Sequence, residues 1–289
     1  MATVDVVIRT KNRPLFLSRA LEDVQSQSFD DWHVIVVNDG GDPESVDAIL
    51  AQADGIDCTV VHLAETVGRP AAGNRGFAAG TAPFVALHDD DDTWDPAFLA
   101  RTVGHLEQTD DEAVAVRTQI IFEREQGDDL VEVGREIFHE HMLEPTYFDH
   151  LRFNHMVPIS MLFRRTALAR IGGFDESLLA VEDWLLNLEL LHAGRVAFLD
   201  EVLANWHQRP DSRGDTGNSV FDGKRDHFVH DRQVRDAEVR RDAVRQGSGF
   251  DAAVTAMVDT AEEPITSRLD ALEAGQSEIL RMLNMLPRR

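Results

Sequence analysis

The 289-residue sequence has a single cysteine, Cys58, and no apolar run long enough for a membrane-spanning helix. One cysteine excludes an intramolecular disulfide, which is typical of a reducing compartment. A bilayer span needs ~20 consecutive apolar residues, and the opening MATVDVVIRT lacks the basic start and apolar centre of a signal peptide. We therefore expect a cytoplasmic protein without a transmembrane segment, either free or held peripherally at the inner membrane face.

Positive charge is scarce, and lysine is nearly absent. The lysines are Lys11 and Lys224, and 28 basic against 52 acidic residues give a formal net charge of −24. Because binding to nucleic-acid phosphates requires a basic surface, this balance argues against a nucleic-acid partner. It also argues against a general affinity for anionic lipid. The hydrophobic content of 43% is nevertheless that of an ordinary globular protein.

Short β-rich runs alternate with amphipathic segments in the first half of the chain. Apolar runs predict four strands, at residues 4–8, 32–37, 58–63 and 84–88. This alternation predicts an α/β fold, with a mostly parallel sheet covered by helices on both faces. In such sheets, ligands bind beyond the carboxyl ends of the strands. The polar stretches NDGG and DDDD follow the second and fourth runs and therefore belong to that edge.

The second half of the chain mixes strands, helices and loops. The same reasoning predicts, in order, a helix at 98–106, a strand at 113–122, a hairpin with its turn at 127–129, a strand at 159–165, a helix at 181–194, short strands at 195–199 and 202–206, and a polar loop at 208–219.

The composition changes after this loop. Residues 221–245 are densely charged, and QGSGF at 246–250 predicts a break. Beyond Pro264, apolar residues recur at four–three spacing with only Gln276 polar in the series: Ile265, Leu269, Leu272, Ile279, Leu283 and Leu286. Three heptads favour a coiled coil, and hence self-association, over an amphipathic helix packed on its own domain. A membrane-surface helix fits less well because the polar face mixes Asp, Glu and Arg.

Four consecutive carboxylates, Asp89–Asp92, follow the fourth predicted strand. Like charges at this spacing repel, so water, a helix N-terminus or a bound cation must offset them. One interpretation is a solvated loop whose last carboxylates cap the helix that opens at Asp95–Pro96. A calcium loop does not fit, because the segment lacks the turn glycine and the distal Glu.

Two catalytic interpretations of the acidic run remain. DDDDT satisfies the D-x-D-x-T pattern of aspartyl-phosphate phosphatases with Asp89 as nucleophile, but that chemistry also needs a downstream Lys, for which Lys224 is the candidate. Alternatively, Asp89 and Asp91 lie two apart on an extended segment and point the same way. They could then face one divalent cation that is held against a diphosphate.

Four stretches of the chain carry a family resemblance. They are VVIRTKNRPLFLSRALEDVQSQSF, WHVIVVNDGG, FVALHDDDDTW and GGFDESLLAVEDW. Together, and in this order between Val4 and His207, they resemble the family 2 glycosyltransferases of GT-A fold. The third matches the pattern apolar-D-x-D-D-x-W, and the fourth matches G-G-F-D-E followed by E-D. The resemblance implies a Rossmann-like, mostly parallel sheet flanked by helices, with a helical C-terminal extension.

The resemblance implies a nucleotide-binding set at the strand ends. Asp39 would accept a hydrogen bond from a pyrimidine ring, and Thr10 would line the same pocket. Asp89 would contact the ribose or a metal-bound water, with Asp90 next to it in the nucleotide site.

The chain departs from the family in the segment before the fourth strand. Many relatives place Arg before the Asn of this segment, whereas here Gly73 precedes Asn74. We expect Arg69 or Arg75 to supply the missing cation near the diphosphate, with Lys11 and Arg13 as a further basic pair near the donor site. Asn74 and Arg69 complete the expected nucleotide-binding set.

The resemblance also implies a metal and a catalytic base. Asp91 would bind Mn²⁺ or Mg²⁺, and His207 would complete the metal site, with an ordinary surface or core histidine as the alternative. Asp183 would be the catalytic base with Glu182 beside it. The alternative for this pair is an acidic helix start that is favourable to the helix dipole.

The expected function is inverting transfer of a sugar from a nucleotide diphosphate, UDP before others, to a hydroxyl of a glycan, glycopolymer or lipid-linked acceptor. The alternative is a catalytically inactive nucleotide-binding or scaffold protein of the same fold. The expected domains are a nucleotide-sugar-binding half at 1–115, an acceptor-binding and catalytic half at 116–210, a polar loop and charged helix at 211–250, and a helical tail for homo-oligomerisation at 251–289.

Overall fold

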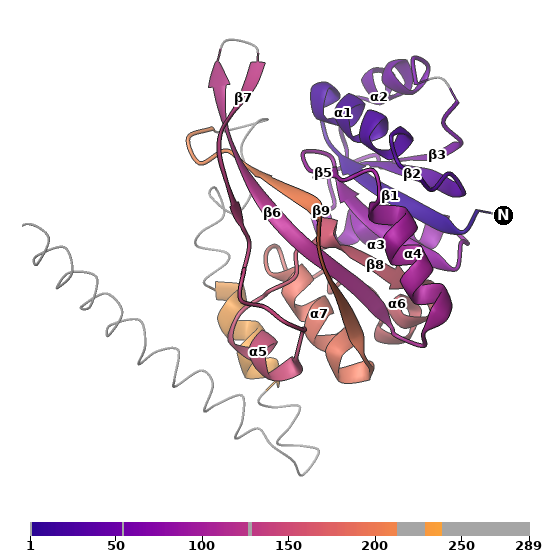
Figure 1. Cartoon of the computed structure of the whole chain (residues 1–289). Coiled ribbons are helices and arrows are strands. Elements are labelled where there is room, and N and C mark those ends of the chain that lie inside the picture. Colours follow the sequence, from indigo (N-terminus) through magenta and orange to yellow (C-terminus); the bar gives the residue numbers. More distant parts are fainter. Residues whose placement is uncertain (1, 54, 127–128, 213–228, 239–289) are drawn as a thin grey trace, which may run out of the picture. The chain divides into compact units, whose positions relative to one another are not determined.

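The computed structural model describes residues 2–53, 55–126, 129–212 and 229–238 (Figure 1). The chain divides into two units, Met1–Arg232 and Gln233–Arg289, and the fold described here is that of the first. The expected oligomerisation tail at 251–289 lies outside the described residues, as does most of the expected polar loop. Within the described ranges, no helix is both long and apolar enough to cross a bilayer.

The N-terminal part of the sheet is parallel, as the alternating pattern predicts. Strand β1 pairs with β2 on one side and with β4 on the other, and β2 pairs with β3. The strands are β1 (Val4–Thr10), β2 (Trp32–Asn38), β3 (Cys58–His62) and β4 (Phe84–Asp89). Since all four run in one direction, their carboxyl ends meet at one edge of the sheet.

The rest of the sheet has mixed direction. Strand β8 is antiparallel to both β4 and β6, β9 is parallel to β6, and β5 and β7 are antiparallel to β9 and β6. The strands are β5 (Thr93–Trp94), β6 (Ala113–Gln126), β7 (Asp129–Ile137), β8 (Met161–Arg164) and β9 (Val196–Gln208). The order across the sheet is β3-β2-β1-β4-β8-β6-β9-β5, with β7 on β6. The expected domain boundary at 115/116 falls inside β6, so both halves share one sheet.

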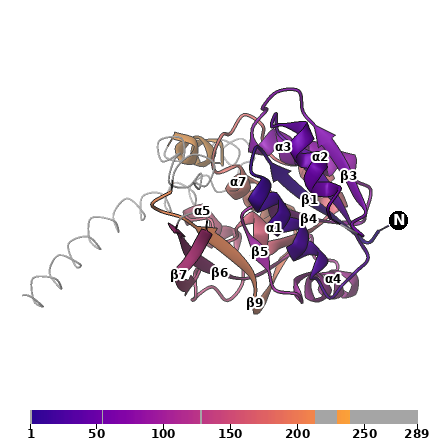
Figure 2. The ribbon, with the colours of Figure 1, turned by 90° about the horizontal axis from the view of Figure 1, so that it is seen from above.

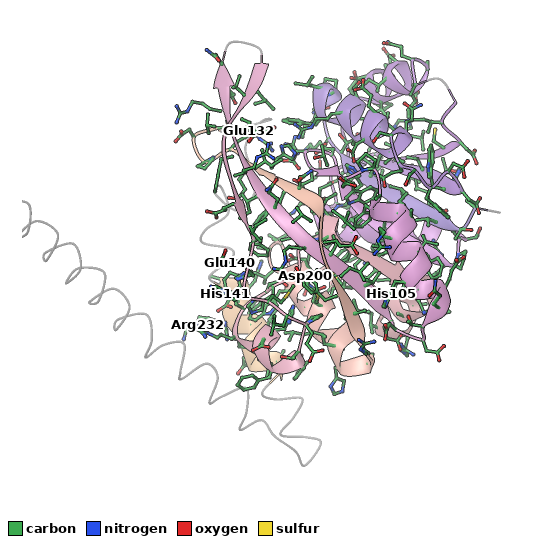
Figure 3. The ribbon with its side chains drawn as sticks, in the orientation of Figure 1. His105, Glu132, Glu140, His141, Asp200 and Arg232 are labelled. Carbon is green, nitrogen blue, oxygen red and sulfur yellow. The ribbon has the colours of Figure 1, made fainter. Side chains whose placement is uncertain are left out.

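One strand replaces the two short strands expected at 195–199 and 202–206. Strand β9 continues through Asp200 and Glu201, where the register against β6 shifts between Val116 and Thr118. From the sequence, these two acidic residues suggest a turn. In the structure they lie where the pairing of β9 with β6 is irregular. Asp200, which is labelled in Figure 3, accepts a hydrogen bond from Nε of Arg117 at 2.5 Å, which gives the carboxylate a partner there.

Helices cover both faces of the sheet, because the side chains of its strands alternate between two apolar clusters. On β1, Val6 and Ile8 belong to one cluster and Val7 to the other. Buried residues of α1 (Pro14–Gln25), α2 (Pro43–Leu50) and α4 (Phe98–Gln108) join the first cluster. Those of α3 (Arg69–Ala79), α6 (Arg165–Ile171) and α7 (Glu182–Ala193) join the second. Figure 2 shows α3 and α7 on one side of β1 and β4 and α4 on the other.

Two shorter helices of the first unit are α5 (Tyr147–Arg152) and the 3₁₀ turn Pro158–Ser160, and residues 229–238 are helical as well. Arg117 on β6 donates to the carbonyl oxygens of His139, Glu140 and Met142, and so ties the loop after β7 to the sheet. Figure 3 shows Glu140 on this loop. The loop leads into α5, which packs on α7.

Candidate active site

Arginine side chains neutralise the acidic run at the tip of β4. Arg9 on β1 reaches Oδ1 of Asp89 at 2.5 Å. Arg13, just before α1, reaches Asp90 at 2.6 Å and Asp91 at 3.0 Å. The guanidinium groups therefore offset the repulsion that four adjacent carboxylates would otherwise create.

A second arginine layer lies behind the first. Arg209, at the end of β9, is fully buried and donates to Oδ2 of Asp91 and, at 2.8 Å, to Oε2 of Glu123. Arg19 on α1 donates to the Asp91 carbonyl and, at 3.1 Å, to Glu123. The ring of Phe16 lies under Arg209 at 4.8 Å from its centroid, so the cations are packed as well as paired.

Burial and pairing divide Asp90, Asp91 and Asp92 into two kinds. Burial raises the pKa of Asp91, but Arg13 and Arg209 outweigh it and hold that pKa below its usual range. Burial raises the pKa of Asp90 to about 7, with Arg13 opposing the rise and Asp91 adding to it. Burial, then Asp91 and Asp89, also raise the pKa of Asp92 well above normal. Charge is thus retained on Asp91, where the arginines converge.

His207 lies beside this cluster, with its ring committed to protein partners. Its Nδ1 is 2.7 Å from Glu123 Oε1, and its Nε2 is 2.9 Å from Thr93 Oγ1. Its backbone N–H donates to Asp92 at 2.8 Å. Burial raises the pKa of Glu123, but His207 and then the arginines outweigh it and lower that pKa to about 2.

The expected metal site can be tested against this arrangement. Among the residues that the structure describes, no group of three His, Cys, Asp or Glu side chains is placed to hold a metal ion. Both guanidinium groups that reach Asp91 contact its Oδ2, and both ring nitrogens of His207 have protein partners. As arranged, the residues do not fit a divalent cation, because guanidinium groups hold Oδ2 of Asp91 and protein partners hold both ring nitrogens of His207.

Sequence reasoning missed Glu123 and Arg209. Glu123 lies on β6 and Arg209 follows β9, and both are far from Asp89–Asp92 in the sequence. The sequence gives little signal for Glu123, because it lies just beyond the strand predicted at 113–122 and opens the charged stretch EREQ. Arg209 carries no signal either, since it lies at the start of a polar stretch.

Asp39 and Thr10 lie at the carboxyl ends of β2 and β1. The Asp39 carboxylate accepts from the backbone N–H of Val67 at 2.7 Å and of Gly68 at 3.1 Å. It thereby shapes the loop that enters α3, where Gly68 has a φ of +93° that favours glycine. Thr10 donates its hydroxyl to Asp90 at 2.8 Å. Both expected nucleotide-binding residues are therefore part of the hydrogen-bonded strand edge.

Asn74 ties α3 to the G-G-F-D-E segment. Its amide accepts from the Phe174 N–H and donates to the Phe174 carbonyl, both at 2.9 Å. A Cβ on Gly73 would lie 2.9 Å from the Phe174 ring, so an arginine at this position would require the ring to move. Of the two alternatives, Arg75 is within 3.7 Å of Glu176, and Arg69 is within 3.3 Å of Glu182.

The acidic pair opens α7. Glu182 is buried and faces Arg69, while half-buried Asp183 accepts a hydrogen bond from Asn154 at 2.9 Å. Burial raises the pKa of Asp183 to about 7, with Glu182 adding to the rise and Arg69 opposing it. A carboxylate with this pKa is suited to accept a proton near neutral pH.

Two ion pairs and one backbone hydrogen bond connect Glu182 on α7 with the tip of β4. Arg9 donates to Asp89 and, at 2.9 Å, to the carbonyl of Arg69, whose own side chain reaches Glu182. The structure therefore brings Asp89, Arg69 and Glu182 into one continuous polar region, together with the arginines around Asp91.

Comparisons with known proteins agree with this architecture. A family model, glycosyl transferase family 2, matches residues 5–172. The uncharacterized glycosyltransferase YwdF of Bacillus subtilis (strain 168) is 29% identical over 63% of this chain and 65% of its own length. The chain thus spans less than two thirds of that relative.

Two solved structures share the fold. The mannosyltransferase PcManGT from Pyrobaculum calidifontis, in complex with GDP-Man and Mn²⁺, has a TM-score of 0.61 at 18% identity, over 96% of this chain and 80% of that one. S. aureus TarS 1-349 in complex with UDP-GlcNAc has a TM-score of 0.58 at 18% identity, over 76% of this chain and 63% of that one. Because the family model also covers more than half of the sequence, the chain belongs to glycosyl transferase family 2 and has the GT-A fold.

Proposed function

We propose that this protein transfers a sugar from a nucleotide diphosphate to an acceptor hydroxyl, with inversion at the anomeric carbon. The observation that carries the proposal is the connection between the β4 tip and Glu182, made by two ion pairs and one backbone hydrogen bond through Arg9 and Arg69. It links an arginine-rich edge, suited to a diphosphate, to Glu182, whose neighbour Asp183 has a pKa of about 7 that suits a general base.

The proposed step is a single displacement. The acceptor hydroxyl oxygen forms a bond to the anomeric carbon while the bond from that carbon to the diphosphate oxygen breaks. Asp183 takes the hydroxyl proton, and the electron pair of the broken bond leaves with the nucleotide. Guanidinium groups at the strand edge, above all Arg9 and Arg13, stabilise the charge that develops on the diphosphate.

A UDP donor is the preferred proposal. The Asp39 carboxylate, just after β2, can only accept a hydrogen bond, so it needs a base with a ring N–H. Uracil has such a group. The TarS structure contains UDP-GlcNAc, whereas the PcManGT structure contains GDP-Man, so both nucleotides belong in the test. The proposed acceptor is a glycan, glycopolymer or lipid-linked glycan.

Divalent metal use is supported by the Mn²⁺ in the PcManGT structure. In this chain Asp91 is paired with Arg13 and Arg209, and the arrangement does not fit the ion. We therefore derive no catalytic step through a metal.

A thermal-shift screen of UDP-, dTDP- and GDP-sugars, with and without Mn²⁺, tests the donor. Asp183→Asn tests the chemistry, and we expect it to abolish transfer while nucleotide binding stays near the wild-type level. Hydrolysis of the donor without acceptor distinguishes an enzyme from an inactive nucleotide-binding scaffold. Full turnover by Asp183→Asn would show that Asp183 is not the catalytic base. If no nucleotide sugar raises the melting temperature, the proposed donor class is wrong.

A further inference from the structure

The proposed base has a neighbour that the family motifs do not include. Asn154, in the segment after α5, donates its Nδ2 hydrogen to Oδ2 of Asp183 at 2.9 Å. Its Oδ1 accepts from Nδ2 of Asn187 at 2.9 Å and from the Met156 N–H at 3.3 Å. Both ends of the Asn154 amide are therefore occupied.

Asn187 determines which way the Asn154 amide points. Asn187 is fully buried on α7, one helical turn after Asp183, and its Nδ2 also donates to the Met156 carbonyl at 2.8 Å. A backbone carbonyl can only accept, so the nitrogen of Asn187 must face Met156 and Asn154. Asn154 must then present its oxygen to Asn187 and its nitrogen to Asp183.

We infer that Asn154, oriented by Asn187, is a positioning residue for the base: it holds the Asp183 carboxylate in place and favours its ionised form. This inference rests on the proposed function, in which Asp183 accepts the acceptor proton. The physical reason is that a donor hydrogen-bonded to a carboxylate stabilises the charged form. It thereby offsets part of the effect of burial and of Glu182, which both favour the protonated acid.

Charged and titratable groups near Asp183 also influence its pKa, and they must be distinguished from the effect of Asn154. Glu182 lies beside it on α7, and Arg69 and Arg9 act on it from α3 and β1. The α5 side carries His150, whose ring is 5.2 Å from that of His155, which in turn is 4.4 Å from that of His139.

Two of these imidazoles do not change charge near neutral pH. Burial lowers the pKa of His139 and of His150 to about 4, and burial also lowers that of His155. A change of activity between pH 6 and 8 therefore does not come from His139 or His150.

The test is the pH dependence of kcat/KM in Asn154→Ala and Asn154→Asp, with nucleotide affinity measured in parallel. Loss of the donor raises the pKa of Asp183, so we expect the acid limb of the Asn154→Ala profile to move up by about one pH unit. The rate then falls about tenfold at pH 6 and recovers at pH 9. Asn154→Asp places a second carboxyl group against Asp183 and should move the limb further.

Asn187→Ala provides a second approach, since it frees the Asn154 amide to turn its oxygen toward Asp183. We expect a shift in the same direction with unchanged nucleotide affinity. A loss that is uniform across pH in all three variants would mean that Asn154 has only a structural role, and it would overturn the inference. Asp183→Asn distinguishes failure of the inference from failure of the proposed function. If this variant is inactive while the pH profiles of the Asn154 variants match the wild type, only the inference about Asn154 fails. Full turnover by Asp183→Asn overturns both.

Discussion

Replacing Arg209 with Met should destabilise the first unit more than the loss of any exposed ion pair. Arg209 is fully buried between Asp91 and Glu123, so its removal leaves two buried carboxylates that each lack one partner. Met retains much of the packing volume against Phe16, which limits the cavity that forms. The loss is therefore mainly electrostatic.

The magnitude follows from the partners that remain. Removing one member of a buried ion pair costs ~3–5 kcal/mol. Asp91 keeps Arg13, and Glu123 keeps His207 and Arg19. Burial raises the pKa of Glu123 and its partners lower it; the net fall from 4.5 to about 2 is equivalent to about 3 kcal/mol, and His207 contributes most of the lowering. We therefore expect a loss of about 2–3 kcal/mol at pH 7.

Urea unfolding followed by tryptophan fluorescence measures this loss. The four tryptophans, Trp32, Trp94, Trp184 and Trp206, all belong to the first unit and therefore report on it. The contribution from Glu123 is fully present above pH 4.5 and is lost as the pH falls through about 2, because its folded pKa is the lower one. The measurement therefore belongs at neutral pH.

Two control variants make the measurement decisive. Arg101→Met removes the exposed pair with Glu201 and should leave the free energy of unfolding unchanged within error. Arg209→Met combined with Glu123→Gln removes a buried carboxylate that has lost one of its partners, and it should recover part of the loss. If Arg209→Met is as stable as the wild type, the arginines do not compensate the acidic run, and the account of the strand edge is wrong.

Further measurements test other parts of the site. The wild-type kcat/KM should fall about tenfold per pH unit below an apparent pKa of about 7, because the protonated form of Asp183 cannot accept a proton; a flat profile down to pH 5 contradicts this. Gly73→Arg should lower the melting temperature, since its Cβ meets the Phe174 ring, and unchanged melting would refute the close packing. Calorimetric titration of Mn²⁺ into nucleotide-free protein should show no saturable binding, because guanidinium groups occupy Asp91; stoichiometric binding that is lost in Asp91→Ala would contradict the arrangement.

Local sequence patterns were enough to predict the elements of the first half. The apolar runs of β1 to β4 are short, uniform and separated by helical periodicity, and each maps onto an observed strand. The pattern was less informative for β9, because Asp200 and Glu201 interrupt its alternation. Only the pairing with β6, and the Arg117 side chain, show that the strand continues through them.

The sequence by itself determined the parallel strand edge, the acidic run placed there and the acidic pair that opens α7, because these depend on residues close together in the chain. Only the tertiary structure decided what neutralises the acidic run. Arg13, Glu123 and Arg209 come from three distant segments, and no local pattern places a guanidinium group against Asp91. The same holds for Asn154, which reaches Asp183 from the segment after α5. Charge compensation in a buried site depends on distances in space, and these are settled only when the sheet brings its strands together.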